Sequence, residues 1–178
     1  MTRYITHGAR ICMLTAGILM AVQALVSARP TRTGVTGNST VQRTVDGEIV
    51  QDVAGNSHIK QLAQTGDFVL CCGDFAIQGT QLLVLNGVLD ATGSGPIAGR
   101  FTVKAEDVDG VETVIWEGTV HGALEGLHFI GHITAHGQGP YAGLILMLDI
   151  EEIAPTETME VFELTGSILD PHGLSSVH

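Results

Sequence analysis

Histidine is the residue type whose spacing points most directly to chemistry. His128, His132 and His136 recur at every fourth position, and His121 lies just upstream. On a helix this spacing would place the imidazoles on one face, close enough to share a metal ion. The segment favours a strand instead, because it is rich in Ile, Thr and Phe and is interrupted by Gly131.

Strand geometry decides what these histidines can do. Residues four apart on a strand share a face but lie about 13 Å apart, so they cannot ligate one ion unaided. A metal site would need a cross-strand partner, such as His121, Glu117 or an acidic residue of a neighbouring strand. The opposite face is the better core face: Phe129, Gly131, Ile133 and Ala135. We therefore expect a row of partly exposed histidines. The alternative is a metal site with these candidate ligands: His121, His128, His132 and His136.

Carboxylates supply the other candidates for chemistry. Glu117 follows Trp116 in an alternating segment, and an inward-facing carboxylate there would be a candidate general base in an enclosed site. The pattern favours a solvent-facing carboxylate over this role. His132 and Tyr141 complete the catalytic candidates. Asp107 and Asp109 resemble the start of a calcium loop, but the further ligands of an EF-hand are missing, so we expect an acidic turn.

The elements that must position these residues are short strands. From residue 67 onward, alternating segments rich in strand formers recur at the spacing typical of a sandwich or barrel. Residues 48–53 form a further candidate strand, 55–64 is open between strand and helical turn, and Gly73 and Asp74 predict a bulge within residues 68–76. Seven or eight strands without a long helix predict an all-β fold, a small antiparallel closed barrel of about eight strands.

One glycine-rich sequence occurs twice. Residues 93–99 and 137–143 share the pattern G-x-G-P-x-A-G, which predicts one hairpin corner used twice in a closed sheet. Both copies also match the dinucleotide fingerprint. That fingerprint requires a helix after the glycines to receive the pyrophosphate, whereas strand-like sequence follows here. The turn interpretation is therefore favoured over nucleotide binding.

The N-terminal segment has the outline of a secretory signal peptide. A basic lead precedes an apolar stretch at 11–26, and small residues precede an expected cleavage after Ala28. A transmembrane helix is the alternative, although the apolar stretch is shorter than the usual ~20 residues. We expect a secreted or periplasmic protein without stable membrane insertion after cleavage. It would contain a flexible linker or arm at 29–45, a barrel domain at 46–170 and a tail at 171–178.

Charge and cysteine content narrow the partners. Without residues 1–28 the chain keeps six basic and nineteen acidic residues, a formal charge of −13. Such an acidic domain should not bind nucleic acid. Cys71 and Cys72 are adjacent, so on a strand they point to opposite faces. Buried free thiols or a thiol paired with another subunit are favoured over a strained vicinal disulfide.

The second corner carries a family resemblance. The sequence GQGPYAGLILMLDI, followed by VFELTGSIL, resembles the closing half of the calycin-like allene oxide cyclase and dirigent barrels. The sequence W-E-G-T at 116–119 and H-G-Q-G-P-Y-A-G-L at 136–144 are also similar to a set of uncharacterised exported bacterial barrel proteins. The resemblance covers residues 93–169. It implies an eight-stranded barrel that forms a trimer or dimer and has a lumen suited to a small apolar molecule. The catalytic residues of the family do not map onto this chain.

Three functional hypotheses follow. The first is a secreted barrel that binds a small hydrophobic ligand, contacted by Trp116, Tyr141 and Met147, or that serves as an extracellular interaction module. The second is a cyclase or isomerase acting in the lumen, with Glu117 or a histidine as the acid–base group. The third is histidine-based metal binding. The first hypothesis requires no cofactor.

Overall fold

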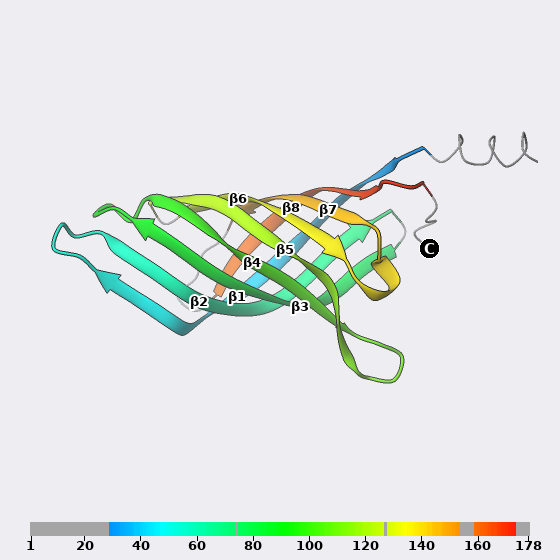
Figure 1. The fold of residues 1–178 in the computed structure, drawn as a ribbon, viewed down its shortest axis with the longest axis horizontal. Helices are drawn as coiled ribbons and strands as arrows, with labels where there is room; N and C mark the ends of the chain where they lie inside the picture. The colour runs from blue at the N-terminus through cyan, green and yellow to red at the C-terminus, as the bar shows by residue number, and fades with distance from the viewer. Residues whose placement is uncertain (1–28, 74, 127, 154–158, 174–178) are drawn as a thin grey trace, which may run out of the picture.

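Eight strands form one closed antiparallel barrel. The computed structural model describes residues 29–73, 75–126, 128–153 and 159–173, so the expected signal segment 1–28 lies outside the described residues. Each strand pairs with its neighbours in sequence, and the first strand closes the sheet by pairing with the last (Figure 1). The all-β fold class and the closed barrel of about eight strands are therefore confirmed. No helix in the described ranges is long and apolar enough to cross a membrane.

The elements run as follows: β1 Thr31–Gln51, β2 Ser57–Cys72, β3 Phe75–Leu89, β4 Gly95–Glu106, β5 Glu112–Glu125, β6 His128–Gly137, the 3-10 helix η1 Gly139–Tyr141, β7 Ile145–Glu152 and β8 Met159–Asp170. The β1–β2 and β3–β4 hairpins turn at one end of the barrel, and η1 lies at the other (Figure 1). β2 ends at Cys72 and β3, its antiparallel partner, begins at Phe75, so the expected bulge within a single strand at 68–76 is wrong.

The segment expected to be a loose arm belongs to the barrel. β1 begins at Thr31 and pairs with β2 on one side and with β8 on the other. The expectation of a linker at 29–45, and of a barrel that starts only at 46, is therefore wrong. Its many polar residues suggested a loop. However, Val35, Ser39 and Val41 are all buried, and threonine, being β-branched, suits the solvent-facing positions of a strand.

The ambiguous segment at 55–64 lies at the start of β2. A register shift falls between Ile59 and Leu62, and Gln61 has a positive φ of 51°. Asn86 holds this irregular backbone, because its Oδ1 accepts the N–H of Gln61 at 3.0 Å. A single extra residue explains why neither a plain alternation nor a helical period fits this segment.

Inward-facing side chains fill the barrel at the end that carries η1. Phe68 and Phe101 meet there with ring centroids 5.6 Å apart, and Trp116 is fully buried. A bulge places both Ile115 and Trp116 in the core, because Val103 pairs with Trp116 while the next residue of β4 pairs with Val114. The alternation expected around Trp116 and Glu117 is therefore interrupted by that extra residue.

Three hairpins share a turn with the sequence D-x-x-G, at 52–55, 90–93 and 107–110. The N–H of each glycine donates to the carbonyl of the aspartate at 3.0 to 3.1 Å, and each glycine has a positive φ. The aspartate carboxylate accepts further N–H groups of the turn. Asp107 Oδ1, for example, accepts those of Asp109 and Val111, both at 2.9 Å. The acidic-turn interpretation of Asp107 and Asp109 is therefore confirmed.

The repeated G-x-G-P-x-A-G sequence does not form the same corner twice. In the first copy Gly93 completes the D-x-x-G turn between β3 and β4, with φ 81°. In the second copy no aspartate precedes the glycines, Gly137 ends β6 and η1 follows. The two copies also lie at opposite ends of the barrel (Figure 1). The expectation of one repeated corner is therefore wrong. Strands β4 and β7 follow the two copies, as the turn interpretation requires.

Replacing Gly66 should test the close approach of β1 and β2. A Cβ on Gly66 would overlap the backbone carbonyl of Thr40, whereas a Cβ on Gly34 would meet nothing within 4 Å. We expect Gly66→Ala to lower the free energy of unfolding by about 2 kcal/mol, because the backbone must shift to relieve the overlap. Gly34→Ala is the control and should change stability by less than about 0.5 kcal/mol. Equal denaturant midpoints for the two variants would contradict this packing.

The first D-x-x-G turn predicts an unusually acidic carboxyl group. Hydrogen bonds from the side chain and then the backbone of Asn56, with a smaller contribution from His58, hold the pKa of Asp52 well below its ordinary value of 3.8. Because the folded-state pKa is depressed, the stabilisation is present above pH 3.8 and is lost as the pH falls toward the folded pKa. In an NMR titration the Asp52 carboxylate should stay ionised at about pH 3. Asn56→Ala should raise the Asp52 pKa, and an unchanged value would contradict the assignment.

Candidate functional site

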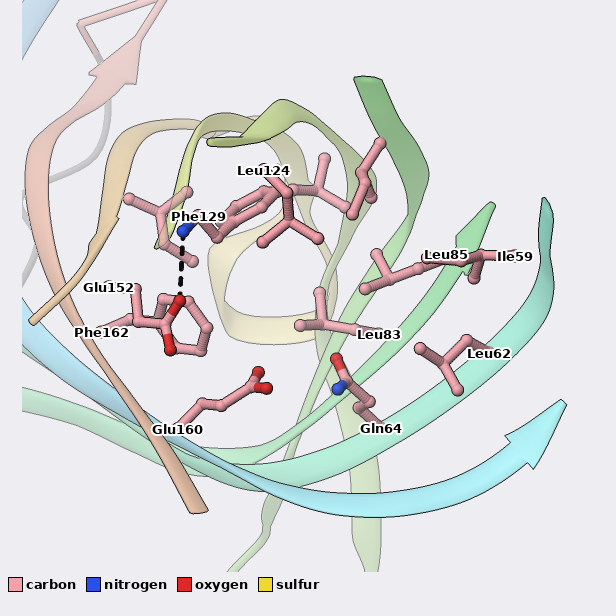
Figure 2. A pocket seen from close by; sticks show the side chains of 13 residues that line it. Ile59, Leu62, Gln64, Leu83, Leu85, Leu124, Phe129, Glu152, Glu160 and Phe162 are labelled. Carbon is pink, nitrogen blue, oxygen red and sulfur yellow. Dashed lines mark hydrogen bonds between the residues drawn. The ribbon is translucent and has the colours of Figure 1, made fainter. Parts of the chain in front are cut away.

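The barrel lumen contains a cavity of about 150 Å³ at the end opposite η1. It lies where β2, β4, β6 and β8 begin and where β3, β5 and β7 end. Aliphatic and aromatic side chains form most of its wall (Figure 2). The lining residues are Ile59, Leu62, Gln64, Leu83, Leu85, Ile97, Val120, Leu124, Phe129, Ile150, Glu152, Glu160 and Phe162. An apolar cavity of about this volume can take up a benzene-sized molecule.

Three polar side chains interrupt this apolar wall. Gln64 comes from β2, Glu152 from the end of β7 and Glu160 from the start of β8. Glu160 lies inward because it shares the alternation of Phe162 and Leu164, which are both buried. Both carboxyl groups and the Gln64 amide point toward the hollow in Figure 2.

Glu152 is the most deeply placed of the three, with only 4% of its surface exposed. Its Oε2 accepts the backbone N–H of Phe129 at 3.1 Å, a bond from β7 to the start of β6. Its Oε1 is buried and has no hydrogen-bond donor in the described part of the chain. A buried acceptor without a donor costs on the order of 1–3 kcal/mol. The carboxyl group is therefore held in place at one oxygen and unsatisfied at the other.

Two aromatic rings belong to the same cavity wall as Glu152. Phe129 and Phe162 meet edge to face, with centroids 6.1 Å apart, and both line the cavity. The main-chain carbonyl of Glu152 lies 2.7 Å from Nε2 of His128, which joins β6 and β7 at the rim. Glu152 is therefore tied to β6 through both its side chain and its main-chain carbonyl.

Two further buried polar residues of the lumen, Gln81 and Ser39, form a hydrogen bond with each other. Gln81 Nε2 donates to the hydroxyl of Ser39, and both residues are 1% exposed. Neither lines the cavity. The pair therefore belongs to the packed part of the core, whereas Glu152 is among the residues that line the cavity.

The predicted ligand residues do not line this cavity. Trp116 and Tyr141 stack at the opposite end, with ring centroids 5.2 Å apart and planes 27° from parallel. Met147 is half-buried on the outer face of β7, where it pairs with Thr134 and Ser167. The assignment of Trp116, Tyr141 and Met147 as ligand contacts therefore finds no support in this cavity and stays a prediction. The two aromatic residues instead close the packed end of the barrel.

Burial raises the pKa values of Tyr141 and Cys72, two residues near that closed end. It raises the pKa of the Tyr141 phenol, and the Cys72 thiol adds a smaller contribution. Burial likewise raises the pKa of Cys72, followed by the effect of Cys71. Cys71 is exposed and Cys72 buried, and neither forms a disulfide. The adjacent cysteines thus point to opposite faces as predicted, and Cys72 is a neutral core thiol at neutral pH.

The histidine row lies on the outside of the barrel. His121 pairs directly with His132 across β5 and β6, and His136 pairs with Glu117. His132 Nδ1 contacts the Asp149 carboxylate, and its side chain is 74% exposed. The predicted row of partly exposed histidines is confirmed, as is the core face opposite it. Within the described ranges, no three His, Cys, Asp or Glu side chains come together as metal ligands.

Glu117 is exposed, so a lumenal role for it as a general base is wrong and the solvent-facing interpretation is correct. The exposed side chain of His132 likewise lies outside the lumen. The carboxyl groups that do face the lumen, Glu152 and Glu160, were not predicted. Two signals could have identified them. Glu151 and Glu152 are adjacent on a strand, so one must face inward, and Glu160 precedes Phe162 in the inward alternation.

Comparison with protein-family models and with curated proteins finds no match for this chain. The functional argument therefore rests on the lumenal cavity and the side chains that line it.

Proposed function

We propose that the protein is a secreted barrel that binds a small, largely apolar ligand in its lumen. The observation that supports this proposal is the cavity of about 150 Å³ lined by β2–β8, with a wall formed mainly by Leu, Ile, Val and Phe. Eight-stranded barrels are just wide enough to be filled by side chains or to hold one small ligand. Ligand sites in proteins are typically concave and apolar with a few placed polar groups.

The packed half of the barrel limits the size of the ligand. Phe68, Phe101 and Trp116 are fully buried and fill the lumen beyond the cavity. A ligand with a long chain or several rings would have to displace this core, at a cost of several kcal/mol. The apolar part of the ligand is therefore about the size of a benzene ring or a short alkyl chain.

A second candidate function is acid–base catalysis in the same cavity. It is favoured by the two carboxyl groups of Glu152 and Glu160, which face an apolar enclosure as general acids and bases of isomerases often do. This proposal retains the cyclase or isomerase hypothesis but assigns the proton transfer to lumenal residues. The homo-oligomer that the family resemblance implies stays a prediction in both cases.

Filling the cavity should abolish ligand uptake. Leu124 lines the cavity, whereas its neighbour Ala123 belongs to the outer face of β5. We expect the wild-type protein to bind fluorobenzene, observed by fluorine NMR, and Leu124→Trp to weaken binding at least about tenfold because the indole occupies the space. Ala123→Trp is the matched control and should bind as the wild type does. Equal binding by both variants, or no binding by the wild type, would contradict the proposal.

Proton exchange can distinguish catalysis from binding. If the cavity is catalytic, a small enone or ketone that enters it should exchange its α-protons with deuterated water faster than in free solution. Glu160→Gln should lower that rate by about 100-fold, since general acid–base groups contribute roughly 10²–10⁴-fold. Exchange at the uncatalysed rate, with ligand bound, would leave the protein a binder and reject the enzyme hypothesis.

A further inference from the structure

We propose that the ligand of the lumenal cavity carries a primary ammonium group, which the carboxylate of Glu152 binds. This inference rests on the proposed function, because it names the chemical class of the molecule that the cavity takes. The ligand would be a small apolar amine, with a body the size of a benzene ring or a short alkyl chain.

The unsatisfied oxygen of Glu152 is the first argument. Glu152 lines the largely apolar cavity, and its Oε1 is buried and has no donor in the described part of the chain, while its Oε2 accepts the N–H of Phe129. A ligand that brings an N–H donor removes the cost of the unsatisfied acceptor. Because the other oxygen is already bonded, little rotational freedom of the carboxyl group is lost when the ligand binds.

The charge of the lining is the second argument. Glu160 adds a second carboxyl group to the cavity wall. An ammonium group would meet negative charge in a low-dielectric site and form charge-assisted hydrogen bonds, which are roughly twice as strong as neutral ones. A carboxylate ligand would bury a further negative charge without a partner, which is strongly unfavourable. A hydroxyl group would donate one hydrogen bond but bring no charge.

The placement of the groups gives the ligand an orientation. In Figure 2, Glu152 and Glu160 stand on one side of the hollow, and Ile59, Leu62 and Leu85 stand on the other. The ammonium end would lie between the two carboxyl groups, near the Gln64 amide. The apolar body would lie against the aliphatic side chains. A single small molecule can meet both requirements in a cavity of about 150 Å³.

Four ligands of similar shape test the head group: benzylamine, benzyl alcohol, benzoate and toluene, measured at neutral pH by calorimetry or NMR. We expect benzylamine to bind at least about tenfold more tightly than benzyl alcohol, toluene to bind weakly and benzoate not to bind. Glu152→Gln should reduce benzylamine affinity about tenfold and leave toluene binding unchanged, because it removes the charge and keeps the shape. Glu163→Gln is the matched control, since it removes one carboxylate from an exposed position on β8.

The outcomes separate this inference from the proposed function. If toluene and benzyl alcohol bind as well as benzylamine, the ammonium assignment is wrong while the apolar cavity stands. If none of the four binds, the proposed function itself fails. If Glu152→Gln does not fold, Glu160→Gln provides the second test, with an expected loss of at least about threefold for benzylamine alone. Tighter binding of benzoate than of benzylamine, or unchanged benzylamine affinity in Glu160→Gln, would overturn the proposal.

Discussion

The closure of an eight-stranded sheet on itself is the constraint on which the rest of the structure depends. Every second side chain of every strand must enter one narrow lumen, and the space there is fixed by the number of strands. Large rings, among them Phe68, Phe101 and Trp116, fill one half of that lumen. In the other half, aliphatic side chains and two carboxyl groups leave a cavity. The candidate site is therefore the half of the lumen that side chains do not fill completely.

A buried carboxyl group in such a site opposes stability. The buried Oε1 of Glu152 has no hydrogen-bond donor in the described part of the chain, which lowers the free energy of unfolding, whereas its Oε2 satisfies the N–H of Phe129. Glu152 ends β7, a short strand that pairs with β6 on one side and β8 on the other, and the burial of its apolar neighbours offsets this unfavourable free energy. Ile150 and Leu148 precede it in the same inward alternation and are 2% exposed. Local frustration inside an otherwise consistent core is a common property of binding sites.

The sequence predicted the fold better than the site, and the reason is physical. Alternation and turn residues are local signals, so the strands from β3 onward and the outward histidines could be predicted. β1 was missed because its polar, threonine-rich surface face resembles a loop, and its burial depends on strands far along the chain. The position and lining of the cavity could not be predicted, because they depend on how side chains from seven strands fail to fill the lumen. The inward positions of Glu152 and Glu160 could have been predicted from the alternation of strand residues. Trp116 and Tyr141 stack on each other at the opposite end of the barrel and so do not line the cavity.

The most direct test of the account is a high-resolution crystal structure of the protein with benzylamine bound. We expect one molecule in the lumen, with its ring against the aliphatic wall and its nitrogen within about 2.7–2.9 Å of Glu152 Oε1. A lumen closed by side chains, or benzylamine bound only on the outer surface, would contradict the claim that this barrel holds a small amine in its interior.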